Sequence, residues 1–114
     1  MELIHDNYQV TYDPVSTTIV WAGELRLAGP DYEPITALMN EVASAQPDTI
    51  TLNLRGLQFL NSFGINVLAR FAARLAKDQA SQLVVLGSTK FAWQQKSLRL
   101  LPRLTREVRL VFGE

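Results

Sequence analysis

The sequence predicts a small α/β protein in which helices pack on a mixed, mainly parallel sheet. Segments with the two-residue alternation of strands take turns with segments that have the spacing of amphipathic helices. Their predicted order is β-β-α-β-α-β-α-β, in which strand–helix–strand connections favour parallel pairing and the first two strands form an antiparallel hairpin. The chain has 114 residues, of which 47% are hydrophobic and 19% charged, and this suits a single domain over residues 1–114.

The N-terminal hairpin is predicted from alternation and turn chemistry. Tyr8, Val10 and Tyr12 alternate with polar residues, as in a half-buried strand. A turn is predicted at Asp13, which a proline follows. The stretch TTIVWAGEL, residues 17–25, is rich in β-branched and aromatic residues and is predicted to be the returning strand.

A first helix is predicted between two prolines. Pro34 suits the first turn of a helix, and Pro47 blocks continuation beyond its end. The next strand is predicted at TITLNL, residues 49–54, which alternates again. Apolar residues of the first helix recur at the spacing of one face: Ile35, Leu38, Met39, Val42 and Ala45.

A second helix is predicted after residue 61. Its polar side carries Arg70, Arg74 and Lys77, which we interpret first as a solvated face and second as a face that contacts a partner. The apolar side, which is expected to pack on the sheet, consists of Ile65, Leu68, Phe71, Ala72 and Leu75.

The C-terminal part is predicted to add a strand, a helix and a last strand. QLVVLG, residues 82–87, is a short continuous apolar run, as expected for a strand that is buried on both faces. Ser88 is a candidate N-cap for a third helix over residues 91–101, which Pro102 would end. The last strand is predicted at VRLVF, residues 108–112.

The net charge of zero hides an asymmetry between the two halves of the chain. Residues 1–54 contain eight acidic residues and one arginine, a net charge of −7, whereas residues 55–114 contain ten basic and three acidic residues, a net charge of +7. Either the halves interleave in the fold and the charges scatter in solvent, or a basic face meets an acidic protein, phosphate or nucleic acid. No nucleic-acid partner is expected, because the bases are not interleaved with aromatic residues and no nucleic-acid-binding motif is present.

Composition also narrows the class of function. The chain has no cysteine and one histidine, His5, so a zinc site and thiol chemistry are excluded and no metal or cofactor is expected. No run approaches the roughly 20 apolar residues of a membrane span and no signal segment is present, so a cytoplasmic protein without a membrane partner is expected. An enzyme is the most distant class, because a Gly-x-Ser-x-Gly motif, a glycine-rich phosphate loop and paired carboxylates at a helical spacing are all missing.

The stretch GLQFLNSFGINVL, residues 56–68, places a serine where strand alternation gives way to helical spacing. Such a junction lies at the carboxyl end of a strand, where contacts to ligands gather in α/β sheets. Asn61 or Ser62 can cap the helix, with a typical contribution of about 1 kcal/mol. Phosphate on Ser62 would add a charge of about −1.5 to −2 there and would obstruct a partner pressed against the site. Gly64 is unfavourable in a helix, which calls for close approach by a partner or by the neighbouring strand.

The same region resembles the signature of STAS domains, the anti-sigma factor antagonist family. In LNLRGLQFLNSFGINVLARF, residues 52–71, a strand and an apolar loop lead into a motif that corresponds to the family's Asp-Ser-x-Gly at a helix N-terminus. AGEL and LVVLG fall where the family's second and fourth strands lie, so the resemblance covers nearly the whole chain. Asn61 stands where the family has aspartate, and the bulky Phe63 stands at a position that is often small.

This resemblance implies a bacterial regulator that acts by partner switching in signal transduction and transcription. It implies that Ser62 is phosphorylated by an anti-sigma factor of the serine kinase type and restored by a phosphatase, and that the unphosphorylated form binds the anti-sigma factor. Asn61, Ser62, Phe63 and Gly64 are then the expected partner-binding residues. The alternative that Asn61 leaves open is a STAS interaction or scaffold module that is never phosphorylated. A homodimer is left open as well.

Overall fold

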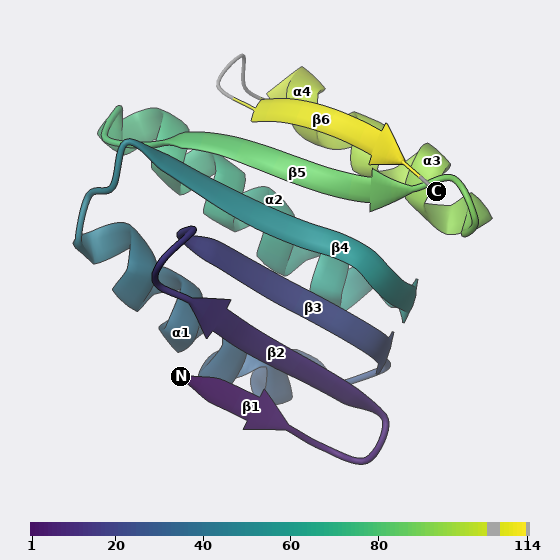
Figure 1. Cartoon of the computed structure of the whole chain (residues 1–114). Helices are drawn as coiled ribbons and strands as arrows, with labels where there is room; N and C mark the ends of the chain where they lie inside the picture. Colours follow the sequence, from purple (N-terminus) through teal and green to yellow (C-terminus); the bar gives the residue numbers. More distant parts are fainter. Residues whose placement is uncertain (105–107, 114) are drawn as a thin grey trace.

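The computed structural model describes residues 1–104 and 108–113, and its elements follow the predicted alternation (Figure 1). The strands are β1 (Glu2–Ile4), β2 (Tyr8–Asp13), β3 (Thr18–Leu25), β4 (Thr49–Leu60), β5 (Gln82–Ser88) and β6 (Val108–Gly113). The helices are α1 (Glu33–Ser44), α2 (Ser62–Asp78), α3 (Ala92–Ser97) and α4 (Leu101–Leu104), with the 3-10 turns η1 (Gly29–Tyr32) and η2 (Leu98–Leu100).

The six strands form one sheet in the order β1-β2-β3-β4-β5-β6, so neighbours in the sheet are also neighbours in the sequence. β1, β2 and β3 pair antiparallel, whereas β3 to β6 pair parallel. The predicted mixed, mainly parallel α/β sheet is therefore confirmed.

The described helices all lie on one face of this sheet (Figure 1). The parallel strands advance in one direction across the sheet, and right-handed crossovers that advance in one direction place every helix on the same side. The prediction that the strand at residues 82–87 is buried on both faces is consequently wrong. Leu83 and Val85 face the helices and are buried, but Val84 and Leu86 on the other face are only half-buried.

The core lies between the helix-covered face of the sheet and the two long helices. Trp21 of β3 is fully buried in it, and Ile50 and Leu52 of β4 belong to the same cluster. The predicted apolar faces of the first two helices are confirmed with two exceptions: Ala45 is exposed while Ala43 is buried instead, and Ile65 is only partly buried against the core. On the opposite side of α2, Arg70 and Lys77 are exposed, as predicted for a solvated face, whereas Arg74 is half-buried and pairs with Asp78 at 3.5 Å.

Several boundaries differ from those predicted. β1 has only three residues, too few for an alternation to be read from sequence. Ser88 ends β5 and is buried, and its hydroxyl accepts the Lys90 N–H, so it does not cap α3. The third helix is broken into α3, η2 and α4, and Pro102 lies inside α4 rather than ending a helix, because proline is tolerated in a first turn.

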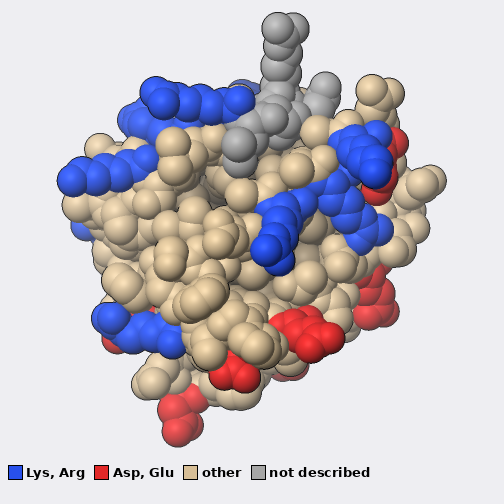
Figure 2. Space-filling view, turned by 180° about the vertical axis from the view of Figure 1, so that it is seen from behind, with Lys and Arg blue, Asp and Glu red and all other residues tan. Residues whose placement is uncertain are grey.

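The strand order also turns the charge asymmetry of the sequence into two poles. The acidic N-terminal half forms β1 to β3 and α1, and the basic C-terminal half forms β5, β6 and α3, at opposite ends of the sheet. Figure 2, which views the helix-covered side, shows most Asp and Glu residues toward the bottom and most Lys and Arg residues toward the top. Of the two alternatives, the interleaving of the halves is therefore wrong.

Candidate functional site

The start of α2 is built by Asn61, which connects β4 to the helix. Its backbone N–H donates to the Leu25 carbonyl at 3.1 Å, so it continues the pairing of β4 with β3. Its backbone is extended, and its side-chain Oδ1 accepts the N–H of Gly64 at 3.1 Å. Of the two candidate caps, Asn61 is thus the N-cap and Ser62 is the first residue of the helix.

The Asn61 side chain is held by two further hydrogen bonds. Its Nδ2 donates to the Leu27 carbonyl at 2.8 Å, and its Oδ1 accepts from the Tyr32 hydroxyl at 2.6 Å. Burial raises the pKa of Tyr32 by more than a backbone hydrogen bond at Leu27 lowers it, and the nearby Tyr8 raises it further, so the phenol keeps the proton that it donates. Asn61 therefore fixes the start of α2 to the loop after β3. An aspartate at this position would have no N–H to offer the Leu27 carbonyl.

Gly64 is buried beneath this first turn of α2. A Cβ at Gly64 would overlap the side chain of Leu60 and would lie 2.8 Å from the Tyr32 hydroxyl. The expectation that Gly64 contacts a partner is therefore replaced by a structural role, because the end of β4 and Tyr32 occupy the space that a side chain would need.

Ser62 and Phe63 point away from the core and form what we call the helix-start surface. Ser62 is exposed, and none of the hydrogen bonds found among the described residues uses its hydroxyl. Phe63 leaves 52% of its area exposed although it is large and apolar, and its ring lies against Gly29. Aromatic side chains are enriched in protein interfaces, so an exposed phenylalanine ring is a candidate anchor for a protein partner.

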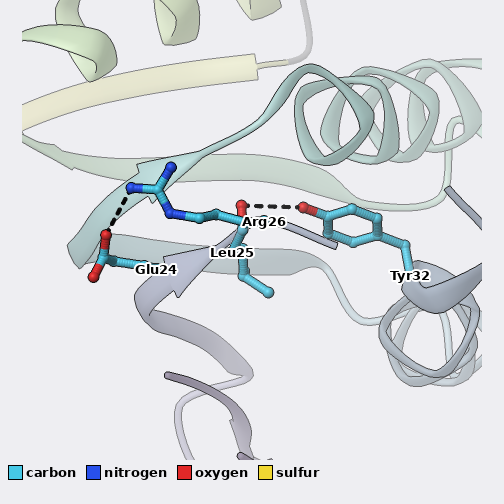
Figure 3. Close-up of polar contacts among 4 residues, drawn as sticks. All are labelled: Glu24, Leu25, Arg26 and Tyr32. Atoms are coloured by element: carbon cyan, nitrogen blue, oxygen red, sulfur yellow. Dashed lines mark hydrogen bonds and ion pairs between the residues drawn. The ribbon is translucent and has the colours of Figure 1, made fainter. Parts of the chain in front are cut away.

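The carboxyl end of β3 forms the rim of this surface. Arg26 is exposed, pairs with Glu24 at 2.9 Å, and lies over the ring of Phe59 with its guanidinium 3.9 Å from the ring centroid. Figure 3 shows this ion pair and the Tyr32 hydroxyl directed at the Leu25 carbonyl, 3.4 Å away. Neither Tyr32 nor Arg26 is predicted from the sequence, because their contacts come from pairing β3 with a strand far along the chain.

A groove of about 940 Å³ opens beside this rim, between the β1–β2 turn and the start of α1. In it His5 stacks on Tyr8 with their ring centroids 4.6 Å apart. Burial raises the pKa of Tyr8, and the negative charge of Asp31 raises it further. The charged residues that line the groove are Asp6, Glu24, Arg26, Asp31 and Glu33, so a surface that meets it should be basic.

The electrostatics of the helix start favour an anion. The first turn of the 17-residue helix α2 contains no acidic residue, so its dipole is not compensated there.

In the described part of the chain, no group of three His, Cys, Asp or Glu side chains could hold a metal ion. None of the helices described is long and apolar enough to cross a membrane.

Asn61→Ala is expected to lower the free energy of unfolding by about 1–3 kcal/mol, because it removes the cap and leaves the Leu27 carbonyl and Tyr32 hydroxyl without their partner. The measurement is urea denaturation monitored by tryptophan fluorescence. Asn66→Ala is the matched control, since Asn66 is an exposed asparagine on the same helix and should change the stability by no more than about 0.5 kcal/mol. Equal losses in the two variants would contradict the role given to Asn61.

No family model matches the chain, and no curated protein matches it in sequence. Solved structures match its fold. One is a chain of the complex between the diguanylate cyclase SiaD and its activator SiaC from Pseudomonas aeruginosa, with a TM-score of 0.74 and 10% identity over 99% of both chains. SiaC of the same organism matches with a TM-score of 0.66 and 11% identity, over 100% of this chain and 95% of that one.

An anti-sigma factor antagonist from Mycobacterium paratuberculosis also matches, with a TM-score of 0.62 and 18% identity over 97% of this chain and 82% of that chain. The chain therefore has the STAS-like fold of anti-sigma factor antagonists, which confirms the fold that the resemblance implied.

Proposed function

We propose that this chain is a regulatory protein-interaction domain that docks a protein partner on its helix-start surface and is switched by phosphorylation of Ser62. The observation that carries the proposal is that Asn61 and its neighbour Ser62 have different roles. Asn61 supplies the cap and the tertiary hydrogen bonds, so the Ser62 hydroxyl is left exposed with no structural task. The exposed Phe63 beside it supplies an apolar anchor.

Phosphate on Ser62 would act on the partner and not on the fold. The unpaired N–H groups and the helix dipole stabilise a dianion at the first residue of α2, typically by about 0.3–1 kcal/mol. The domain would remain folded. A partner that covers Phe63 would have to bury that dianion against its own surface, which strongly disfavours the complex unless the charge is paired.

The proteins that share the fold support the class of partner that we propose. One is an anti-sigma factor antagonist, and SiaC is the activator of a diguanylate cyclase. For this chain we propose an anti-sigma factor or a related regulator of the serine kinase type, with a phosphatase that restores Ser62. Because one of these proteins activates an enzyme, we propose that the complex of this chain regulates either transcription or the activity of an enzyme that the chain binds.

The first test concerns the modification. The protein, isolated from cells of its source in growth and in starvation, is examined by intact-mass spectrometry and peptide mapping. The expected result is a form heavier by one phosphate, with the phosphate on Ser62 and lost in Ser62→Ala. The matched control is Ser97→Ala, a change at a half-buried serine of α3 that should leave the modification in place.

The second test concerns binding. The recovered partner is titrated with purified variants by isothermal calorimetry. Ser62→Asp is expected to weaken binding at least about tenfold and Phe63→Ala about tenfold or more, because both act at the anchor of the interface. Ser62→Ala should stay within about threefold of the wild type, as should Lys77→Ala at the far end of α2. Binding of Ser62→Asp as tight as that of the wild type would refute the switch.

A constitutive interaction module is the second candidate, and the observation that favours it is Asn61 in place of the family's aspartate. Its signature differs from that of the switch. No phosphate would be found under any condition, yet Phe63→Ala would still weaken the complex.

A further inference from the structure

One face of the sheet has no described helix packed on it (Figure 1), and we call it the bare face. The strand registers place two rows of residues across it. The first row is Asp13, Thr18, Thr51, Val84 and Arg109. The second row is Glu2, Thr11, Val20, Asn53, Leu86 and Val111. Along the strands these residues alternate with the buried residues that face the helices.

The two ends of these rows carry opposite charges, and their centre carries none. Glu2 and Asp13 lie on β1 and β2, Arg109 lies on β6, and all three are exposed. The residues between them in these two rows are valine, leucine, threonine and asparagine, and each is half-buried. The next residue of β4 on this face, Arg55, is exposed and lies outside the two rows, where its Nε donates to the Gly87 carbonyl. Within the two rows, an uncharged centre with charged ends matches the composition of a protein interface, whose core is depleted of charged residues.

We propose that a second copy of this chain docks on the bare face, sheet against sheet. The charge pattern fixes the symmetry. A two-fold axis parallel to the strands, midway between the sheets, places β1 of one copy over β6 of the other, so that each Arg109 faces the Glu2 and Asp13 of the opposite copy. A two-fold axis perpendicular to the strands would stack β1 on β1, where like charges repel. Only the first arrangement is complementary.

The size of the bare face limits the area that this dimer can bury. Six strands spaced by about 4.8 Å span about 24 Å, and two rows that are each about 7 Å deep along the strands offer roughly 330 Å² per copy. A standard stable interface buries about 800 Å² per partner, so we expect association in the micromolar range or weaker. Helix α2 packs on the other face of the sheet, so the dimer leaves the helix-start surface free and does not depend on the function proposed for Ser62.

The experiment is sedimentation equilibrium of the whole chain across the micromolar to millimolar range, at low and high salt. The wild type is expected to reach a dimer and no larger species, and salt is expected to weaken it. Arg109→Glu should raise the dissociation constant at least about tenfold, because both symmetric contacts change from attraction to repulsion. Leu86→Lys should abolish the dimer, because it places charges in the uncharged centre.

A charge swap tests the symmetry directly. Glu2→Arg alone should also weaken self-association. An equimolar mixture of Glu2→Arg and Arg109→Glu should nevertheless favour a heterodimer, because three of its four contacts are between opposite charges, against two in the Glu2→Arg homodimer and none in the Arg109→Glu homodimer. Lys77→Glu on the exposed side of α2 is the control and should not change the dimer, and circular dichroism confirms that each variant is folded. A wild type that stays monomeric at millimolar concentration, a mass that grows beyond two copies, or a dimer indifferent to Arg109→Glu and Leu86→Lys would overturn the proposal.

Discussion

Gln94→Leu is expected to lower the free energy of unfolding by about 3–6 kcal/mol, because it leaves three buried backbone groups without a hydrogen bond. The Nε2 of Gln94 donates to the carbonyls of Leu54 at 2.7 Å and Leu57 at 2.9 Å. Its Oε1 accepts the N–H of Ser88 at 2.7 Å. Gln94 is fully buried, so water cannot replace these bonds, and leucine fills a similar volume without making any of them.

The position of these groups explains why a glutamine is needed. The register of β3 against β4 shifts between Val20 and Ala22, opposite the part of β4 that contains Leu54. At such a bulge the carbonyls leave the ladder, and another group must satisfy them. Gln94 therefore joins the irregular part of β4 to the end of β5.

Chemical denaturation of Gln94→Leu and of Gln95→Leu measures this effect. Gln95 is an exposed neighbour whose side chain makes one bond, to the Thr89 carbonyl at 3.3 Å. Its replacement should change the free energy of unfolding by less than about 0.5 kcal/mol. If Gln94→Leu were no more destabilised than Gln95→Leu, the bulge carbonyls would have to find other partners.

Phe71→Ala is expected to lower the free energy of unfolding by about 3–5 kcal/mol, because it opens a cavity where α2 meets the core. Phe71 is only 4% exposed and belongs to the main core cluster with Leu68 and Leu75 of the same helix. The measurement is the midpoint and slope of urea unfolding.

Arg70→Ala is the matched control for Phe71→Ala. Arg70 is the preceding residue of α2, but it is exposed on the other side of the helix, so its replacement should cost less than about 0.5 kcal/mol. Equal unfolding midpoints in the two variants would mean that the face of α2 assigned to the core is wrong.

The position of the candidate site could be predicted from the sequence, but the role of each residue in it could not. The change from alternation to helical spacing near Ser62 locates a strand–helix junction, and local periodicity suffices for that. Which of Asn61 and Ser62 caps the helix depends on Tyr32 and on the Leu27 carbonyl, which lie about thirty residues earlier in the chain. The reason for Gly64 likewise depends on Tyr32.

The sequence by itself determined the class of fold, the number and faces of the long helices, and the place of Ser62 between a strand and a helix. Each of these follows from interactions within one segment: periodic burial, proline positions and turn chemistry. It also determined that acidic and basic residues separate along the chain.

Only the tertiary structure decided how those segments pair and pack against one another. The strand order converted charge separation along the chain into two poles, and the common direction of the crossovers left one face of the sheet bare. The exposure of Phe63, the burial of Gln94 and the network of Asn61 depend on pairings between distant residues, and no local pattern encodes which strand lies beside which. The physical reason is that register and strand order are set by the packing of the whole sheet.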